Sequence, residues 1–339
     1  MCVSKVDYEV ILKGSYTARA GVEKLLDELS IPERTTSTES PILIICLNIA
    51  NLKYIEIGPL SLLRGAIASW NDEGKSVTVK LGSSRSVISY LQRMDFFKSI
   101  HVVIPENFKR HPAGSRFVVF TEINSPSSQS TDDLSARLAT CITGENDDGE
   151  VVFTDQPPVE GYFAGIAYSV SELIKNVQQH SCGIGHIVAQ HYSSTGLTQI
   201  AIVDNGIGIK ESFFRSSSPV SAQIDSDLDA IKLALEAEVS SKTHSVGVGG
   251  VENAGVGLTF LTEIARNAKG HFQVVSGNGF VNVDSEVDLP NVFNGTFVCI
   301  TFDRNSLETF GNLLENARLK ILGAPGSDLD VDLDGIFGG

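Results

Sequence analysis

The stretch Gln199-Ile-Ala-Ile-Val-Asp-Asn-Gly-Ile-Gly208 places an aspartate and two glycines directly after an apolar run. The run has the length and β-branched content of a strand, so Asp204 to Gly208 is expected to form the turn that leaves it. Gly206 and Gly208 lack a Cβ, which lets the backbone pass close to a bound molecule. The same pattern also occurs in ordinary Asx-turns, so its neighbours decide how it is interpreted.

A helix is predicted upstream of this turn. Between Gly161 and His180, apolar residues recur at spacings of three and four, the period of an amphipathic helix. Glu172 and Asn176 are four residues apart within it, so both side chains project from one helix face. Taken alone, this pair is most simply a solvated polar face.

A glycine-rich segment follows the turn. Gly247-Val-Gly-Gly-Val-Glu-Asn-Ala-Gly-Val-Gly-Leu258 runs into a predicted helix at Leu258–Asn267. Such a loop directs backbone N–H groups and the positive end of a helix at phosphate. No Gly-Lys-Ser/Thr follows the glycines, which excludes a P-loop. A dinucleotide fingerprint also fits poorly, because the preceding strand and downstream acidic residue are not evident.

In this order, the three elements resemble the ATP-binding domain of the GHKL superfamily, which includes gyrase-type topoisomerases, Hsp90, sensor histidine kinases and mismatch-repair ATPases. The resemblance covers Val159 to Phe302, and it includes Gly295-Thr296 at the start of an alternating strand, as in the family's last core strand. It implies a Bergerat-type α/β sandwich, in which helices cover one side of a mixed sheet.

The resemblance implies roles for individual residues, with ATP and Mg²⁺ as ligands. Asn176 would hold the metal beside the phosphates, and Glu172 would be the general base that activates water. Asp204 would accept a hydrogen bond from the adenine amino group, and Thr296 would support it through water. The positions that would wrap the nucleotide are Gly206, Gly208, Gly255, Gly257 and Leu258.

The loop between Lys210 and Ala254 would be the flexible ATP lid of such a domain. Within it, Asp229–Lys242 resembles the lid helix of bacterial kinase-like ATPases. The length of this segment predicts a cover that orders when nucleotide binds.

The first 123 residues alternate between strand-like and helix-like patterns, which favours an α/β layer domain. Strands are expected at Tyr8–Leu12, Pro41–Leu47, Val77–Leu81 and His101–Ile104, and helices at Ala18–Leu29, Leu60–Trp70 and Val87–Phe97. Between Ile42 and Ile104 this layout resembles the STAS domain of bacterial anti-anti-sigma factors. Regulatory STAS domains carry a phosphorylated serine where this chain has Glu56-Ile-Gly-Pro59, so a phospho-switch is not expected here.

The expected organisation has two domains, α/β in class. A STAS-like domain at 1–123 is followed by a linker at 124–150, with a short helix near Leu134–Ile142. The GHKL domain occupies 151–305 and starts with a strand at Val151–Phe153; a helix at 306–322 and an acidic tail at 323–339 complete the chain. The tail begins like a calcium-binding EF-hand loop, but the bidentate glutamate would fall beyond Gly339.

Composition narrows the class of protein. The 339 residues carry 26 basic and 41 acidic side chains, a net charge of −15, which argues against a broad nucleic-acid surface or an anionic-membrane surface. The five cysteines form no CxxC pair, which favours a reducing, cytoplasmic setting over a disulfide framework. A bacterial protein is what the resemblance to bacterial anti-anti-sigma factors implies. No apolar run approaches the ~20 residues of a membrane span.

These observations predict a Mg²⁺-dependent ATPase that acts as a conformational switch for a protein partner, which would dock on the STAS-like domain or the acidic tail. Two alternatives stay open: an anti-sigma-like protein serine/threonine kinase, and a nucleotide-gated binding module with negligible turnover. No histidine lies between His111 and His180, which argues against a sensor histidine kinase. The sequence does not decide whether Lys175 or Lys242 would contact the γ-phosphate. It also does not decide whether the chain forms a homodimer.

Overall fold

The computed structural model describes residues 7–31, 43–110, 116–123, 128–145, 163–216, 219–236, 256–267, 269–304 and 306. Several sequence predictions lie outside these ranges, namely the strand at Val151–Phe153, the glycine-rich loop as far as Gly255, the tail at 323–339 and, apart from Ser306, the helix at 306–322. Among the described residues, no helix is both long and apolar enough to cross a membrane.

The N-terminal half builds a three-stranded parallel sheet with the order β1-β2-β3. Its strands are β1 (Tyr8–Tyr16), β2 (Ile44–Ile55) and β3 (Ser76–Lys80), and the intervening helices are α1 (Gly21–Leu29) and α2 (Ile57–Asp72). Parallel neighbours need a long crossover, and a helix lies in each one here. The predicted alternation of strands and helices is therefore confirmed as far as Lys80.

Beyond β3 the prediction is less accurate. The helix expected at Val87–Phe97 is two helices, α3 (Arg85–Arg93) and α4 (Phe96–Ser99), because Asp95 adopts a left-handed conformation with φ of 59° between them. The strand expected at His101–Ile104 is wrong. These residues pair with no described strand, and Val103 is 93% exposed.

The second sheet has five strands in the order β4-β5-β6-β8-β7. They are β4 (Phe117–Ile123), β5 (Gly185–Tyr192), β6 (Leu197–Asp204), β7 (His271–Asn282) and β8 (Glu286–Asp303). All four pairings are antiparallel, so the described part of this sheet is not the mixed sheet that was expected. Strand β4 also lies before the predicted boundary at residue 123, yet it pairs with β5 and belongs to the second sheet.

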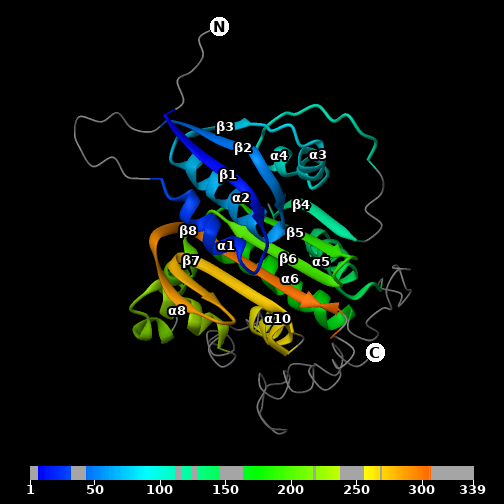
Figure 1. Cartoon of the computed structure of the whole chain (residues 1–339). Coiled ribbons are helices and arrows are strands. Elements are labelled where there is room, and N and C mark those ends of the chain that lie inside the picture. The colour runs from blue at the N-terminus through cyan, green and yellow to red at the C-terminus, as the bar shows by residue number, and fades with distance from the viewer. Residues whose placement is uncertain are drawn as a thin grey trace, which may run out of the picture.

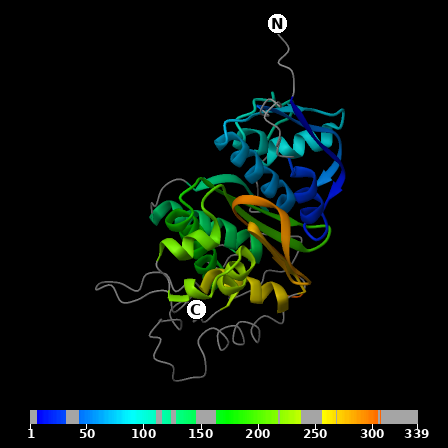
Figure 2. The ribbon, with the colours of Figure 1, turned by 90° about the vertical axis from the view of Figure 1, so that its left-hand side faces the viewer.

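Helices pack on one face of the five-stranded sheet (Figures 1 and 2). This layer contains α5 (Ser128–Thr143), α6 (Phe163–His180), α8 (Asp227–Leu235) and α10 (Val256–Asn267). Strand β6 alternates across the sheet, because Ile200 and Ile202 belong to this helical core whereas Ala201 and Val203 face the opposite side. The short helix predicted in a linker is thus α5, a 16-residue part of the core.

Helix α2 covers the other face of the same sheet, so helices cover both sides and not one. It lies between the two sheets and is buried almost all round, which fits its continuous apolar sequence (Figure 1). A Cβ on Gly58 would lie 2.7 Å from the Cys299 sulfur, and one on Gly65 would lie 2.4 Å from a methyl of Val203. These glycines let α2 approach β6 and β8 closely, and the two halves of the chain share one core.

Two further elements follow β6 in the region predicted as the lid. They are α7 (Gly208–Arg215) and the 3-10 helix η1 (Pro219–Gln223), and α8 comes next. The lid helix expected at Asp229–Lys242 begins earlier, at Asp227, and ends at Leu235. Ser226 and Asp229 form a capping box at its start, which fixes this boundary.

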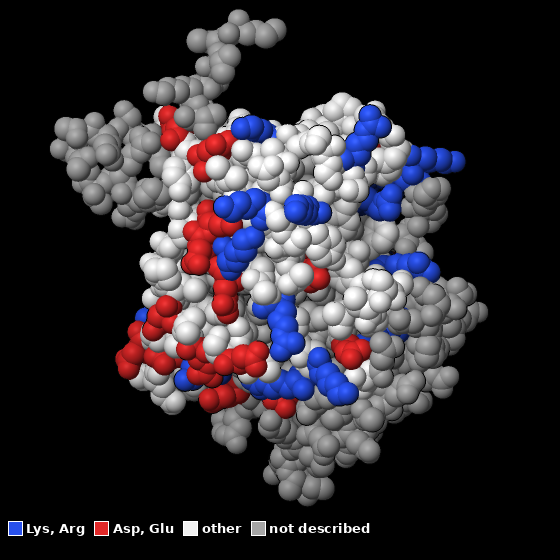
Figure 3. All heavy atoms as spheres, viewed as in Figure 1, with Lys and Arg blue, Asp and Glu red and all other residues white. Residues whose placement is uncertain are grey.

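The surface carries both signs of charge. On the face shown in Figure 3, Lys and Arg side chains are scattered among Asp and Glu, and they do not merge into a continuous basic area. On this face, therefore, the described side chains present both signs of charge.

Candidate functional site

Asp204 is the last residue of β6, and its carboxylate is buried with 3% of the residue exposed. The N–H of Gly206 donates to its Oδ1 at 2.8 Å, so the side chain closes an Asx-type turn on itself. Burial raises the pKa of Asp204 to about 6, although the backbone N–H groups of Gly206 and Thr296 act in the opposite direction. A buried, acceptor-only group at a strand end can recognise a donor on a ligand.

The two predicted glycines are required by the local geometry. A Cβ on Gly206 would lie 1.8 Å from the carbonyl oxygen of Ser181, and Gly208 has a φ of +75°. The Ser181 carbonyl also accepts a hydrogen bond from the N–H of Ile207 at 2.8 Å. The turn after β6 therefore lies directly against the residue that follows α6.

Strand β8 supports the same turn from the neighbouring position in the sheet. Thr296 is paired with Asp204, and Gly295 before it has a φ of +101° with its Cβ position 2.1 Å from the Asp204 carbonyl oxygen. Thr296 is half-buried, and its hydroxyl lies 3.5 Å from that of Ser276. The structure thus brings the predicted Thr296 beside the predicted Asp204.

Ser276 of β7 was missed by the sequence prediction. Its hydroxyl accepts from the N–H of Ile209 at 2.9 Å and donates to the carbonyl of Gly295 at 3.2 Å, and the residue is 1% exposed. It therefore satisfies an N–H in the first turn of α7 and joins that helix to β8. No local motif marks a serine in a strand for such a role, so no signal in the sequence could have identified it.

Ser276→Ala is expected to lower the free energy of unfolding by about 1–3 kcal/mol, because it removes the hydroxyl that accepts from the part-buried N–H of Ile209 and donates to the carbonyl of Gly295. Urea unfolding of the full chain measures this loss. Ser135→Ala is the control, since that hydroxyl donates at 3.0 Å to Asp132 in its own helix. A loss no larger than the control's would show that the hydroxyl does not hold α7 to β8.

Helix α6 carries the predicted acid and amide. Glu172 is 1% exposed, and its Oε1 accepts a hydrogen bond from Lys175 Nζ at 2.9 Å, while its Oε2 has no partner among the described residues. Asn176 is half-buried one turn later, and no hydrogen bond joins its side chain to another described residue. Lys175, one of the two lysines considered for the γ-phosphate, is thus engaged by Glu172; Lys242 lies outside the described residues.

The remaining predicted positions are described only in part. Gly257 lies in the first turn of α10 and Leu258 is buried in the helical core, whereas Gly255 lies outside the described residues. Helix α10 packs against α6, so its start belongs to the same helical layer as Glu172 and Asn176. The described residues contain no group of three or more His, Cys, Asp or Glu side chains that could hold a metal ion.

The C-terminal end of α2 contacts both sides of the Asp204 turn. Asp72 accepts a hydrogen bond from the side-chain amide of Asn205, and the amide of Asn294 donates to Ser69 Oγ at 2.7 Å and to Glu73 Oε1 at 3.2 Å. Asn205 follows Asp204, and Asn294 precedes Gly295 and Thr296. Side-chain hydrogen bonds thus join the Asp204 turn to the C-terminal end of α2, a connection that no sequence pattern predicted.

The N-terminal end of α2 is buried on the same sheet. Glu56 Oε2 accepts from the Gln199 side-chain amide at 2.5 Å and from the Ala18 N–H at 2.7 Å, and Ile57 N–H donates to the Tyr192 hydroxyl at 3.2 Å. These contacts fix the start of α2 against β5, β6 and the segment after β1.

A buried polar contact fixes the middle of α2. Arg64 Nη2 lies 3.2 Å from His186 Nε2 on β5, and both residues are less than a tenth exposed. Burial, together with the charge of Arg64, lowers the pKa of His186 to about 3, so the imidazole is neutral and its Nε2 can accept from the guanidinium. Polar contacts at both ends and in the middle thus hold α2 against the five-stranded sheet.

Comparison of the chain with protein-family models, with curated proteins and with solved structures finds no match in any of the three.

Proposed function

We propose that the chain is a GHKL-type ATP-binding protein, a Mg²⁺-dependent ATPase that acts as a conformational switch for a protein partner. The observation that carries this proposal is that two polar side chains of α6 lie in sequence along the helix from the Asp204 turn. Asn176 lies five residues and Glu172 nine residues before Ser181, whose carbonyl touches the Asp204 turn. At about 1.5 Å of rise per residue, they lie roughly 7 Å and 13 Å along the axis from that turn.

An extended ATP molecule has the same order. With its adenine amino group donating to Asp204, the ribose and phosphates would run along α6 toward its N-terminal half. Asn176 would then lie beside the phosphates nearer the base, and Glu172 beside the terminal phosphate. A guanine carbonyl at the same position would face the Asp204 carboxylate as acceptor against acceptor, so the site is expected to prefer adenine.

Glu172 is suited to accept a proton from water. Lys175 holds one carboxylate oxygen at 2.9 Å, so Oε2, a buried atom without a partner among the described residues, is the oxygen that would act as the base. In this role Oε2 takes the proton as the water oxygen bonds to the γ-phosphorus, and the bond to the ADP oxygen breaks.

The side chain of Asn176 fits a magnesium ion held mainly by phosphate. Mg²⁺ prefers oxygen ligands and often takes only one or two from the protein, and the amide oxygen of Asn176 is not committed to another described group. When bound, the ion would neutralise phosphate charge. Asn176 would position it one helical turn from Glu172.

Helix α2 supplies the route from nucleotide to partner. A ligand that reorders the Asp204 turn changes the Asn205–Asp72 and Asn294–Glu73 contacts, and α2 is shared by both halves of the chain. The partner would bind the N-terminal half, in line with the expectation that it docks on the STAS-like region.

A nucleotide-gated binding module with negligible turnover is the second candidate. The Glu172–Lys175 ion pair favours it, because Lys175 already occupies one oxygen of the carboxylate that would have to orient the attacking water. The two candidates share the nucleotide site and differ only in whether Glu172 acts on water.

Glu172→Ala is expected to abolish phosphate release from γ-labelled ATP and to leave ATP affinity within about threefold of the unmodified chain, since a general base contributes about 10²–10⁴-fold to the rate. The measurement is Mg²⁺-dependent release of labelled phosphate, with a parallel binding titration and a check for label on the protein band.

Glu263→Ala is the matched control. Glu263 is also a buried acid paired with a cation three residues later, Arg266 at 2.7 Å, on the neighbouring helix α10. It should retain turnover. Label on the protein would identify the kinase alternative, binding without either product would identify the binding module, and absence of ATP binding in the unmodified chain would overturn the proposal.

A further inference from the structure

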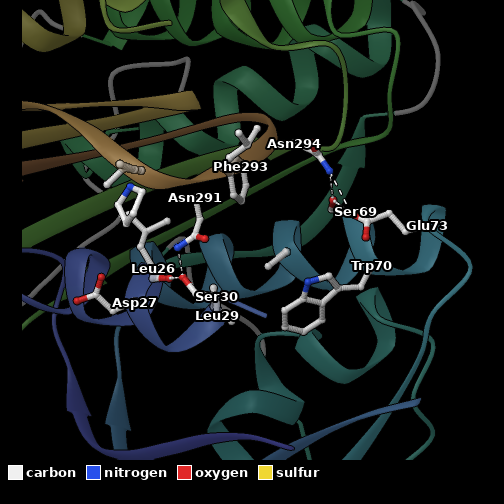
Figure 4. A pocket seen from close by; sticks show the side chains of 14 residues that line it. Leu26, Asp27, Leu29, Ser30, Ser69, Trp70, Glu73, Asn291, Phe293 and Asn294 are labelled. Carbon is white, nitrogen blue, oxygen red and sulfur yellow. Dashed lines mark hydrogen bonds between the residues drawn. The ribbon is translucent and has the colours of Figure 1, made fainter. Parts of the chain in front are cut away.

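A crevice of about 100 Å³ lies between α1, α2 and the first half of β8 (Figure 4). It does not overlap the residues assigned to the nucleotide. Its walls are mostly apolar and come from all three elements, with Leu26, Leu29, Ala66, Leu289, Val292 and Phe293 among the lining side chains. A cavity of about 150 Å³ holds benzene, so a compact group of about five or six non-hydrogen atoms is the size that fits here.

On one side of the crevice, the polar groups of α2 and β8 satisfy one another. The side-chain amide of Asn294 donates to Ser69 Oγ at 2.7 Å and to Glu73 Oε1 at 3.2 Å, and the Ser69 hydroxyl donates to the same carboxylate oxygen at 3.3 Å. Lys75 pairs with the other oxygen of Glu73 from outside the crevice. This carboxylate is therefore already paired and is not a group that needs a ligand.

The polar groups on the side of α1 are also engaged. The amide nitrogen of Asn291 donates to Ser30 Oγ, and the Ser30 hydroxyl donates to the Leu26 carbonyl at 3.1 Å. Trp70 is then the one lining residue whose side-chain donor group bonds to no described residue. It is 6% exposed, and Figure 4 shows the nitrogen edge of its ring turned toward the crevice, on the side of Phe293.

The free group of Trp70 defines the chemistry of a ligand. An indole nitrogen is a donor only, so it is satisfied by an acceptor such as a carbonyl oxygen. A buried donor without a partner is unfavourable, so filling the apolar crevice favours a molecule that also carries the acceptor. No lysine or arginine lines the crevice, and the exposed carboxylate of Asp27 does, which disfavours an anion. The acceptor is therefore expected to be neutral.

We propose that this crevice binds a small neutral molecule that carries a hydrogen-bond acceptor, such as a carbonyl oxygen, on a compact apolar body. The oxygen would accept from the indole N–H of Trp70, and the apolar body would pack among the leucine, valine and phenylalanine side chains of α1 and β8. The hydrogen bonds of Asn291 and Asn294 would stay as they are, because the ligand needs no other polar contact.

The first measurement uses NMR, because Trp70 is the single tryptophan of the 339 residues and gives one indole N–H signal. The isotope-labelled full chain is titrated with cyclopentanone, and in parallel with methylenecyclopentane, which has the same shape without the acceptor. Cyclopentanone should move the indole proton downfield in a saturable way, since a new hydrogen bond deshields it. Methylenecyclopentane should cause no downfield shift.

Trp70→Phe keeps an aromatic ring and removes the donor. By ligand-observed NMR, this change should weaken cyclopentanone binding at least fivefold and leave methylenecyclopentane binding within about twofold, because only the ketone loses a hydrogen bond. Tyr54→Phe is the matched control, since it removes a donor from a ring that is 40% exposed on β2 and outside the crevice. It should bind both molecules like the unmodified chain.

Two further comparisons test the charge and the source of the acceptor. Cyclopropanecarboxamide should bind at least fivefold more tightly than cyclopropanecarboxylate, which has the same shape and a negative charge. A free molecule and the backbone of a partner protein both present carbonyl oxygens. Acetyl-leucine methylamide that binds more tightly than cyclopentanone would overturn the assignment to a free molecule in favour of a partner's peptide carbonyl.

The proposal is overturned if cyclopentanone causes no saturable downfield shift, or if Trp70→Phe weakens both five-membered rings equally. Equal affinity for the carboxamide and the carboxylate would overturn the requirement for a neutral ligand. The titrations contain no nucleotide, so their failure leaves the ATP proposal untouched, and failure of ATP binding leaves this one untouched.

Discussion

Replacing Gly295 with alanine is expected to lower the free energy of unfolding by about 3–5 kcal/mol and to abolish nucleotide binding. Two separate costs add at this position. The φ of +101° is unfavourable for any residue with a Cβ, and that Cβ would lie 2.1 Å from the backbone oxygen of Asp204. Because the obstructing atom is backbone, β6 and β8 must separate at the Asp204–Thr296 pair.

Gly74→Ala is a matched control for the first of these costs. Gly74 has a φ of +78° and no heavy atom within 4 Å of the Cβ position, so it carries the conformational cost alone, about 1–2 kcal/mol. Urea unfolding of both variants separates the two contributions. Equal losses of unfolding free energy in the two variants would mean that β6 and β8 can accommodate a Cβ at Gly295 without a steric clash.

Sequence patterns predicted the helices, strands and turns that are determined by residues close together in the chain. The apolar period between Gly161 and His180 predicted α6, which spans Phe163–His180, and the run before Asp204 predicted β6. The turn after β6 was also predictable, since Gly206 and Gly208 occupy positions that exclude a Cβ or need a positive φ. In the N-terminal half, alternation predicted three strands and the helices between them.

Pairing between distant segments was not predictable in this way. Strand β4 joins β5 at the Glu122–His186 pair, 64 residues further along the chain, and nothing in Phe117–Ile123 specifies that partner. Helix α2 showed an all-round apolar sequence, but its two covering sheets come from opposite halves of the chain. The same holds for the site, where Ser276, Asn205 and Asn294 act through contacts that only the assembled sheet creates.

Asp204→Asn is expected to have opposite effects on nucleotide binding and on stability. Loss of the charge weakens the hydrogen bond to adenine, and a hydrogen bond to a charged group is worth about 1.5–3 kcal/mol, which corresponds to roughly 10- to 100-fold in ATP affinity. The carboxylate in the free protein is, however, buried and ionised at neutral pH, which is unfavourable for folding.

The pH dependence follows from the direction of the pKa shift. The pKa of Asp204 is raised from 3.8 to about 6 in the folded chain. Its contribution to stability is therefore fully present below pH 3.8 and is lost as the pH rises through about 6. Asparagine resembles the protonated acid at every pH. The variant should thus be more stable than the unmodified chain at pH 8, by about 2–3 kcal/mol at about 1.4 kcal/mol per pKa unit, and this gain should shrink toward pH 4.

Urea unfolding at pH 4.5 and pH 8, with ATP titrations at pH 8, measures both effects. Asp133→Asn removes the same charge from a side chain that is 73% exposed, so it controls for net charge and should show neither effect. Unchanged ATP affinity in Asp204→Asn would remove Asp204 from the site. A stability difference that does not grow with pH would mean that the folded chain does not keep a buried, ionised carboxylate there. If both effects appear together, the ionised carboxylate of Asp204 destabilises the folded chain but strengthens ATP binding. A neutral side chain of the same shape would give a more stable fold, so adenine recognition is the reason for a carboxylate at this position.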